Sequence, residues 1–387
     1  MRYLWQHLEQ ILAEYDAKTP LHHFLKSYFK KYPKLGSRDR RGLSDAVYAW
    51  YRAGKSIQGG DDNPAIQRLA AMYLCGLRPK AFISFFPESW IENTAGLGDR
   101  IAILQEEGLS IEPARIFPGA ETLLSAGISD LEWQHSMLRQ PGLFLRIRND
   151  RTDVAARLQR AGIAFEWLSE TCMALPNGTD VAPLLRPESY VVQDASSQAT
   201  GRFLTASAGE LWWDCCSGAG GKSLLLKDAN PSVSLLATDV RQSILNNLKD
   251  RFRLYHHTLN RTAVLDASDA ATSAETIAGR RFDGIICDVP CTGSGTWSRT
   301  PESCYFFDRA SIAEYATKQQ AILRNAGRYI KADGKIVYIT CSVFRQENED
   351  VIETIAAEGN LRIESAELIN GLSGGADALF VAVLRSA

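Results

Sequence analysis

The sequence predicts an α/β protein with three parts: an all-helical region at residues 1–138, a small α+β unit at 139–204, and a larger domain at 205–387 built on a parallel sheet. Three observations lead to this prediction. Apolar residues recur at helical spacing in the first part, short apolar runs surround one helix in the second, and strands alternate with helices in the third. A length of 387 residues agrees with two or three domains.

The composition excludes several classes of protein. The 43 Lys and Arg residues nearly balance the 45 Asp and Glu residues, so the net charge of -2 excludes a uniformly basic nucleic-acid binder but allows a local basic face. No apolar run approaches the roughly 18 residues of a membrane span, and the N-terminus carries acids where a signal peptide is basic and then apolar. The eight cysteines are too dilute for a disulfide scaffold and form no CxxC pair. We therefore expect a cytoplasmic protein with reduced thiols and no metal.

The first 138 residues are predicted to be helical because apolar residues recur every three or four positions, as at Leu4, Leu8, Ile11 and Tyr15. Between residues 26 and 55, nine basic residues stand against two acids, a local net charge of +7. The basic residues are Lys26, Lys30, Lys31, Lys34, Arg38, Arg40, Arg41, Arg52 and Lys55, and the aromatic residues among them are Tyr28, Phe29, Tyr32, Tyr48, Trp50 and Tyr51. Basic side chains can pair with RNA phosphates and aromatic side chains can stack on unpaired bases, so this combination suits RNA binding. A solvated helix face is the alternative explanation.

The middle part combines strand and helix patterns. LFLRIRND predicts a strand, and TDVAARLQRAG predicts a helix that is closed by Gly162. Three further short strands are expected at IAFEWL, TCMAL and YVVQD.

From Ala206 onward, short apolar runs alternate with helical stretches. Six runs are expected to be strands that each end near an acid or a cysteine: LWWDCC, SLLATD, AVLD, DGIICDVP, KIVYITCS and LFVAVL. Helical patterns such as RQSILNNLKDRFRLYHH lie between them. This alternation predicts a parallel sheet covered on both faces, and such sheets bind ligands beyond the carboxyl ends of their strands.

A glycine-rich loop follows the first of these strands, in the sequence DCCSGAGGKSLLL. Its glycines allow a tight turn and close approach of a ligand to the backbone at a helix N-terminus. A P-loop for ATP is one alternative, but its first glycine would fall at Cys216. The other alternative is a nucleoside site, which needs an acid at the end of the next strand, and Asp239 stands there, 25 residues after Asp214.

Acidic residues end four successive strands, at Asp214, Asp239, Asp266 and Asp288. We expect them to form a negative mouth that matches a cationic nucleoside such as S-adenosylmethionine and matches ATP poorly without a metal. Ordinary loop aspartates are the alternative explanation, which accounts for one or two of the four.

Two cysteines stand where strands end in polar loops: Cys291 in DVPCTGSG and Cys341 in KIVYITCS. If adjacent central strands carry them, both thiols reach the same cleft edge beside Asp288. The remaining cysteines considered are expected to pack, either as inert core residues (Cys75, Cys172, Cys287) or within the glycine turn (Cys215, Cys216).

These residues resemble the RNA 5-methylcytosine methyltransferases of the Nop/Nol/Sun group. The motifs of that family occur in order as QDASSQ, DCCSGAGGKS, Asp239, Asp266, DVPCTGSGTWSRTPE and TCSVFRQENE, with DALFVAVL at the end. The match covers about residues 140–387. GSRDRRGLSDAVYAWYR further resembles the helical domain carried by the bacterial 16S rRNA methyltransferase B branch.

The resemblance implies an architecture and an activity. It implies a NusB-like RNA-binding domain at 1–138, a small α+β, RRM-like RNA-binding unit at 139–204, and a Rossmann-like S-adenosylmethionine-dependent methyltransferase domain at 205–387. The implied reaction is methylation of carbon 5 of a single-stranded or loop cytosine in RNA, with 16S rRNA as the expected substrate and no obligate protein partner.

The resemblance also implies roles for individual residues. Cys341 would add to carbon 6 of cytosine, Cys291 would release the product, Asp288 would hold the base at its N3 and amino edge, and Lys222 would pair with Asp288. The implied cofactor contacts are Cys216, Ser217, Gly218, Ala219, Gly220, Gly221, Lys222, Asp239, Asp266 and Asp288. The implied RNA contacts are Arg146, Arg299, Arg38, Arg40 and Arg41, with ordinary surface charge as the alternative. Gln193 and Asp194 are equally explained as structural residues that cap the next helix.

Some positions depart from the family pattern. Ala219 stands in place of a proline, Arg148 in place of an asparagine, Ile244 in place of a basic residue, and Ala378-Leu379 in place of Gly-Phe. None of them is one of the two cysteines, so the implied chemistry is retained.

Three other functions agree with parts of the sequence. A DNA cytosine-5 methyltransferase also uses a Pro-Cys motif, but there that cysteine is the nucleophile and the Thr-Cys partner is absent. A tRNA cytosine-C5 methyltransferase would share the chemistry. A non-catalytic RNA-binding ribosome-assembly factor would keep the fold without binding S-adenosylmethionine.

Overall fold

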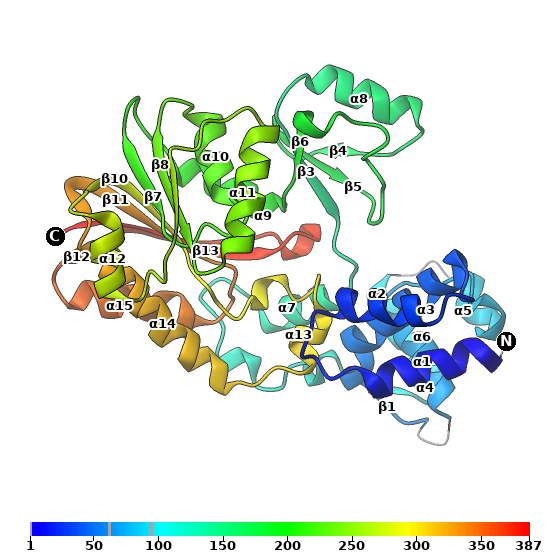
Figure 1. The fold of residues 1–387 in the computed structure, drawn as a ribbon. Helices are drawn as coiled ribbons and strands as arrows, with labels where there is room; N and C mark the ends of the chain where they lie inside the picture. Colours follow the sequence, from blue (N-terminus) through cyan, green and yellow to red (C-terminus); the bar gives the residue numbers. More distant parts are fainter. Residues whose placement is uncertain (1, 61–62, 93–95) are drawn as a thin grey trace. The chain divides into compact units, whose positions relative to one another are not determined.

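The computed structural model describes residues 2–60, 63–92 and 96–387, which form two compact units (Figure 1). The first unit comprises Met1–Thr122, Ser129–Gln140 and Trp297–Asp308. The second comprises Leu123–Ile128, Pro141–Thr296 and Arg309–Ala387. The α+β unit and the larger domain predicted from the sequence therefore share one compact unit, while a short segment that follows the Pro-Cys motif lies with the N-terminal helices.

The first unit is mostly helical. Its helices are α1 (Arg2–Glu14), α2 (Leu21–Lys31), α3 (Ser37–Ala53), α4 (Pro64–Leu74), α5 (Glu88–Glu92), α6 (Leu97–Glu106), α7 (Asp130–Met137) and α13 (Pro301–Tyr305). Leu8, Ile11 and Tyr15, three positions of the predicted apolar stripe, are buried. The expectation of an all-helical region is wrong in one detail, because β1 (Ile57–Gln58) and β2 (Ser110–Ile111) form an antiparallel pair. Strands of two residues are too short to produce a periodic pattern.

Aromatic packing explains why α13 lies in the first unit although it is distant in sequence. The ring centroids of Tyr51 and Tyr305 are 5.2 Å apart, and those of Tyr15 and Phe306 are 5.8 Å apart. The backbone N–H of Leu21 also donates a hydrogen bond to the carboxylate of Glu302.

The second unit contains a seven-stranded sheet with the order β12-β13-β11-β10-β7-β8-β9. Its strands are β7 (Leu211–Asp214), β8 (Ser234–Asp239), β9 (Arg261–Val264), β10 (Phe282–Asp288), β11 (Ile330–Thr340), β12 (Leu361–Asn370) and β13 (Ala378–Ser386). Pairing is parallel from β11 through β10, β7 and β8 to β9, whereas β13 is antiparallel to both β11 and β12. The sheet is thus predominantly parallel, as the fold prediction required.

Two features of this sheet differ from the prediction. Strand β12 was not predicted, because its side chains are mostly exposed and produce no apolar run. Strand β13 was expected to belong to the parallel alternation. The connection at residues 371–377 is shorter than the roughly dozen residues that a parallel crossover needs, so β13 returns antiparallel.

Helices cover both faces of the large sheet (Figure 1). One apolar cluster joins Trp213, Ile285 and Ile336 to residues of α12 (Ala270–Ile277), α14 (Ala310–Gly327) and α15 (Glu349–Ala357). The neighbouring side chains in the same strands point the other way and pack with α10 (Gly221–Ala229) and α11 (Gln242–Leu254). This alternation is the period of two of β-strands, and it leaves the carboxyl ends of the strands as the ligand-binding edge.

The second, smaller sheet has the order β4-β5-β3-β6, and all of its pairs are antiparallel. Its strands are β3 (Leu143–Ile147), β4 (Glu166–Trp167), β5 (Cys172–Leu175) and β6 (Tyr190–Val192), and α8 (Arg151–Arg160) covers one face. Residues 176–189, which are all described, contain only a short 3-10 turn in place of a second helix. On the opposite face, Phe144 and Cys172 pack against Ala376, so that face is buried within the unit. The RRM-like assignment stays a prediction.

In the part of the chain that the structure describes, no helix is both long enough and apolar enough to cross a membrane.

Candidate active site

Cys291 and Cys341 meet at the carboxyl ends of adjacent strands, as the sequence predicted. β10 and β11 pair in parallel with Asp288 opposite Ile339, so the loops that follow both strands leave the sheet at the same edge. The two sulfur atoms lie 3.3 Å apart. Both cysteines line a cavity of about 410 Å³.

The same cavity gathers most of the predicted site residues. Those that line it are Cys216, Gly218, Asp239, Asp266, Asp288, Cys291 and Cys341. The predicted residues Ser217, Ala219, Gly220, Gly221 and Lys222 lie next to it in sequence but are not part of its lining.

The glycine loop is held in place by the sheet and by α11. The backbone N–H of Gly218 donates to Asp239 Oδ2 at 3.0 Å, and one guanidinium nitrogen of Arg251 donates to the carbonyl oxygen of Ala219 at 2.6 Å. Gly218 and Gly220 have positive φ values of 50° and 83°, which favour glycine. The contact from Arg251 restrains the carbonyl of Ala219, the residue that stands in place of the family's proline.

Asp239 and Asp266 present carboxylates to the cavity, and each has a basic neighbour. The Arg241 Nε lies 3.1 Å from Asp239 Oδ1, and the Lys318 Nζ lies 3.8 Å from Asp266 Oδ2. Burial alone would raise the pKa of Asp266, but hydrogen bonds from Ser268 and the charge of Lys318 lower it below its ordinary value. Asp266 is therefore an anion at neutral pH.

The prediction of a mouth of four acids is wrong for Asp214. This side chain is 1% exposed, accepts a hydrogen bond from the Ser223 hydroxyl at 2.6 Å, and does not line the cavity. Burial raises the pKa of Asp214 to about 7. The mouth contains three acids, and Arg241 and Lys318 line it as well, so its charge is mixed.

Lys222 forms the pair that the resemblance implied. Its Nζ lies 3.6 Å from Asp288 Oδ2 and donates to the Ser197 hydroxyl at 2.7 Å. Ser197 lies in α9 (Ala195–Ala199), which is capped by Asp194 through hydrogen bonds from the N–H groups of Ser196 and Ser197. The structural explanation of Asp194 is thus the one observed.

The surroundings of the two thiols affect the pKa of Cys291. The hydrogen bond with Cys341, together with burial and the charge of Glu347, raises the pKa of Cys291 well above its ordinary value. Cys75, Cys172, Cys215 and Cys287 are buried, as expected for packing residues.

Glu347 is a site residue that the sequence analysis missed. It is 0% exposed and accepts hydrogen bonds from the loops of both cysteines. Its position six residues after Cys341, within TCSVFRQENE, was the available signal, but sequence alone does not distinguish a buried glutamate from an exposed one.

The prediction that Arg146 contacts RNA does not agree with its placement. Arg146 is 6% exposed, its Nε donates to the Gln193 amide oxygen at 2.9 Å, and its guanidinium pairs with Asp228. Arg148 pairs with the same carboxylate at 2.6 Å. Both arginines join the small sheet to α10 instead of facing solvent.

The other predicted RNA contacts lie in the first unit. Arg40 lines a groove of about 660 Å³ together with Lys26, Lys30, Phe29 and Tyr48. Arg38 and Arg41 line a second groove of about 530 Å³, and Arg299 lies in the segment Trp297–Asp308 of the same unit. Arg52 differs from the rest of the basic cluster, because it is buried and donates to the carbonyl oxygens of Met137 and Arg139.

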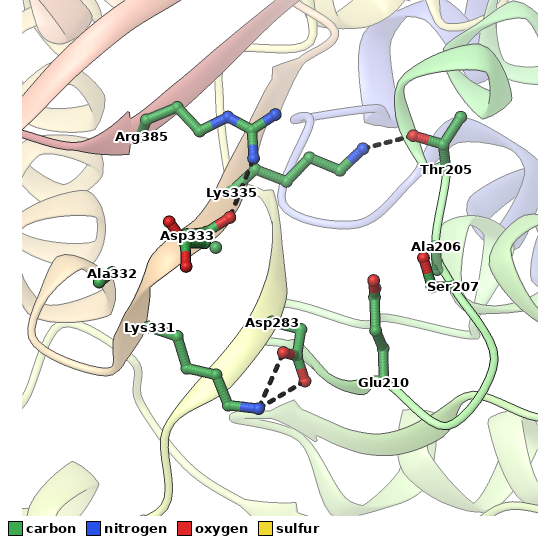
Figure 2. A pocket seen from close by; sticks show the side chains of 11 residues that line it. Thr205, Ala206, Ser207, Glu210, Asp283, Lys331, Ala332, Asp333, Lys335 and Arg385 are labelled. Atoms are coloured by element: carbon green, nitrogen blue, oxygen red, sulfur yellow. Dashed lines mark hydrogen bonds and ion pairs between the residues drawn. The ribbon is translucent and has the colours of Figure 1, made fainter.

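A second cavity in the sheet domain, of about 490 Å³, lies at the opposite, amino-terminal ends of β10 and β11 (Figure 2). Lys331 points toward Asp283, with its Nζ 2.8 Å from each carboxylate oxygen, and Lys335 donates to the Thr205 hydroxyl at 2.6 Å. No predicted site residue lines this cavity. Among the described residues, no group of three or more His, Cys, Asp or Glu side chains is arranged to hold a metal ion.

Comparison with known proteins places this site in a family context. Residues 202–377 match the family model described as 16S rRNA methyltransferase RsmB/F. A ribosomal RNA small subunit methyltransferase B from Shewanella oneidensis is 32% identical over 215 residues, which are 55% of this chain and 49% of that protein. The chain thus spans about half the length of the curated relatives it matches.

Solved structures share the fold at low sequence identity. The crystal structure of PH0851 superposes with a TM-score of 0.68 and 19% identity, over 98% of this chain and 97% of the other. The structure of NSun6 from Pyrococcus horikoshii with SFG gives a TM-score of 0.58 and 14% identity, over 71% of this chain and 96% of the other. The resemblance predicted from the motifs is confirmed over residues 202–377, which match the family of 16S rRNA methyltransferases RsmB/F.

Proposed function

We propose that this chain is an S-adenosylmethionine-dependent methyltransferase that acts on carbon 5 of a cytosine in 16S rRNA. The observation that carries the proposal is the distance of 3.3 Å between the sulfurs of Cys291 and Cys341, in a cavity that also contains three carboxylates and the glycine loop. The name of the family matched by residues 202–377 supports ribosomal RNA as the substrate.

The residues of the cavity fit S-adenosylmethionine. Beside the cavity, the hydroxyl of Ser217 is buried and has no hydrogen-bond partner among the described residues, and a Cβ added at Gly218, which lines the cavity, would meet open space. Asp239 would accept hydrogen bonds from the ribose hydroxyls, Asp266 would lie near the adenine, and Asp288 and the loop at residues 216–221 would lie near the methionine end. When bound, S-adenosylmethionine supplies an electrophilic methyl group.

Cys341 acts as the nucleophile in this proposal, as the resemblance of the Thr-Cys and Pro-Cys motifs to the family implies. Carbon 5 of cytosine is a poor nucleophile while the ring is conjugated. Addition of the Cys341 thiolate to carbon 6 breaks the conjugation and makes carbon 5 reactive. Asp288, held by Lys222, contacts the N3 and amino edge of the base and orients it for this addition.

Cys291 serves the second half of the reaction. After methylation, the proton on carbon 5 must leave and the bond between carbon 6 and sulfur must break. In this proposal Cys291, as a thiolate, takes the proton from carbon 5; the electron pair of that C–H bond forms the C5–C6 double bond, and the bond from carbon 6 to sulfur breaks to return Cys341 as a thiolate.

RNA contacts in this proposal come from the first unit. The groove is lined by Arg40, Lys26 and Lys30, which can pair with phosphates, and by Phe29 and Tyr48, which can stack on unpaired bases. Arg38 and Arg41 extend the basic surface, and Arg299, in the segment Trp297–Asp308, is a further contact in this proposal.

The test is methylation of defined RNAs by the purified full chain. Unmethylated 16S rRNA, tRNA and DNA are each incubated with S-adenosylmethionine, and 5-methylcytosine is mapped by bisulfite sequencing. We expect a single methylated cytosine in 16S rRNA and none with Cys341→Ala. Methylation of tRNA or DNA alone would contradict the proposed substrate. Absence of both methylation and S-adenosylmethionine binding by calorimetry would contradict the activity and favour an assembly factor.

A further inference from the structure

Glu347 lies between the loops of the two cysteines and takes no part in the chemistry above. Its Oε1 accepts from the backbone N–H of Thr292 and from the Gln319 amide, both at 2.9 Å. Its Oε2 accepts from the hydroxyls of Thr292 and Ser342, both at 2.5 Å. Thr292 directly follows Cys291, and Ser342 directly follows Cys341. One carboxylate therefore contacts both loops that carry the reacting sulfurs.

Helix α14 adds a second connection to the same loop. The amide nitrogen of Gln319 donates to Glu347 and also to the carbonyl oxygen of Pro290, at 2.9 Å in each case. The backbone on both sides of Cys291 is thus tied to the carboxylate, directly at Thr292 and through Gln319 at Pro290. Gln319 is itself 0% exposed, so solvent does not compete for these hydrogen bonds.

The hydrogen-bond chemistry calls for an ionised carboxylate at this position. Four donors converge on two oxygens, which is the arrangement that an ionised carboxylate satisfies and that a neutral amide satisfies only in part. Burial raises the pKa of Glu347, while the hydrogen bonds from Ser342 and Thr292 oppose that rise. The same carboxylate is one of the charges that raise the pKa of Cys291.

We propose that Glu347 is a positioning residue for methyl transfer, whose carboxylate holds the Cys291 and Cys341 loops in the arrangement that keeps the two sulfurs in contact. The proposal rests on the function proposed above. Misplacing a reacting group by about 1 Å can cost on the order of 100-fold in rate, so a loss of this carboxylate should reduce kcat more than it changes KM.

Other contacts between the loops allow the variant to fold. The N–H of Gly295 donates to the Cys341 carbonyl oxygen at 2.8 Å, and the N–H of Val343 donates to the Ser294 hydroxyl at 2.9 Å. Glu347→Gln keeps the shape of the side chain while it replaces one acceptor by a donor. Glu349→Gln is the matched control, because Glu349 bonds to Ser125 and Ala126 and to neither cysteine loop.

The first measurement does not depend on activity. Dibromobimane, which bridges two thiols that are close together, is added to the full chain, and bridged peptides are identified by mass spectrometry. We expect bridging of Cys291 to Cys341 in the wild type and in Glu349→Gln, and bridging at least about tenfold slower in Glu347→Gln. Bridging of the variant at the wild-type rate would overturn the proposal.

The second measurement separates binding from reaction. We expect Glu347→Gln to lower kcat for RNA methylation at least about tenfold, with KM for RNA, KM for S-adenosylmethionine and the thermal unfolding midpoint close to those of Glu349→Gln. An unchanged kcat would overturn the positioning role. A wild-type protein that is bridged by dibromobimane but methylates no RNA would instead contradict the proposed function and leave the geometry intact.

Discussion

Asp214 offers a test of how the glycine loop is built, through the pH dependence of stability. The carboxyl is fully buried at the end of β7 and bonded to Ser223 in α10, and burial raises its pKa from 3.8 to about 7. Between those two pH values the folded protein binds a proton that the unfolded chain has released. The stabilisation that protonation of Asp214 gives to the folded protein is therefore fully present below pH 3.8 and is lost as the pH rises through 7.

The magnitude follows from the two pKa values. A difference of about three pH units corresponds to about 4 kcal/mol in total, of which about 3 kcal/mol is lost between pH 5 and pH 8. Asp214→Asn removes the titration and keeps an oxygen that accepts from the Ser223 hydroxyl. The free energy of unfolding of the wild type, minus that of Asp214→Asn, should accordingly fall by about 3 kcal/mol between pH 5 and pH 8.

Urea denaturation of both proteins, followed by tryptophan fluorescence, to which Trp212 and Trp213 in β7 contribute, measures this difference. Other titrating groups are common to both proteins and cancel in the subtraction. A difference that stays constant within about 1 kcal/mol over this pH range would refute the assignment of a buried, protonated Asp214.

Two further substitutions test the packing and the loop. A Cβ at Gly284 would lie 2.2 Å from the Trp212 ring. Gly284→Ala should therefore lower the free energy of unfolding by about 1–3 kcal/mol or more, as overpacking of a rigid core does. Urea denaturation measures this free energy, and a variant as stable as the wild type would contradict the prediction. Arg251→Ala removes the donor to the Ala219 carbonyl. It should weaken S-adenosylmethionine binding roughly tenfold, because a hydrogen bond to a charged group contributes about 1.5 kcal/mol. Calorimetry measures the affinity, and an unchanged affinity would show that the glycine loop does not need the Arg251 hydrogen bond.

The sequence predicted the parts of the fold that leave a periodic or ordered signal. Buried strands such as β8 and β10 appear as apolar runs. The sequence placed Cys291 and Cys341 at strand ends, and the structure shows that the strands before them, β10 and β11, are adjacent. β12 left no such signal, because an edge strand with mostly exposed side chains has no apolar face to reveal.

Individual polar residues were harder to assign than strands, because burial decides their role and the sequence does not encode it locally. Asp214 and Asp239 both end strands, yet only Asp239 lines the cavity. Arg146 occupies a position that suggested RNA binding but is enclosed by Gln193 and Asp228. Glu347 stood in a recognised motif without a role until its four hydrogen-bond donors were located.

The most direct test of the central claim is covalent trapping of the nucleophile. Cys291→Ala is incubated with S-adenosylmethionine and 16S rRNA, and the products are separated under denaturing conditions. If Cys341 attacks carbon 6 and Cys291 releases the product, a stable protein–RNA adduct should accumulate, linked through Cys341, and it should be absent from the variant that lacks both cysteines. An adduct linked through Cys291 in Cys341→Ala, or no adduct in Cys291→Ala while the wild type methylates RNA, would contradict the account.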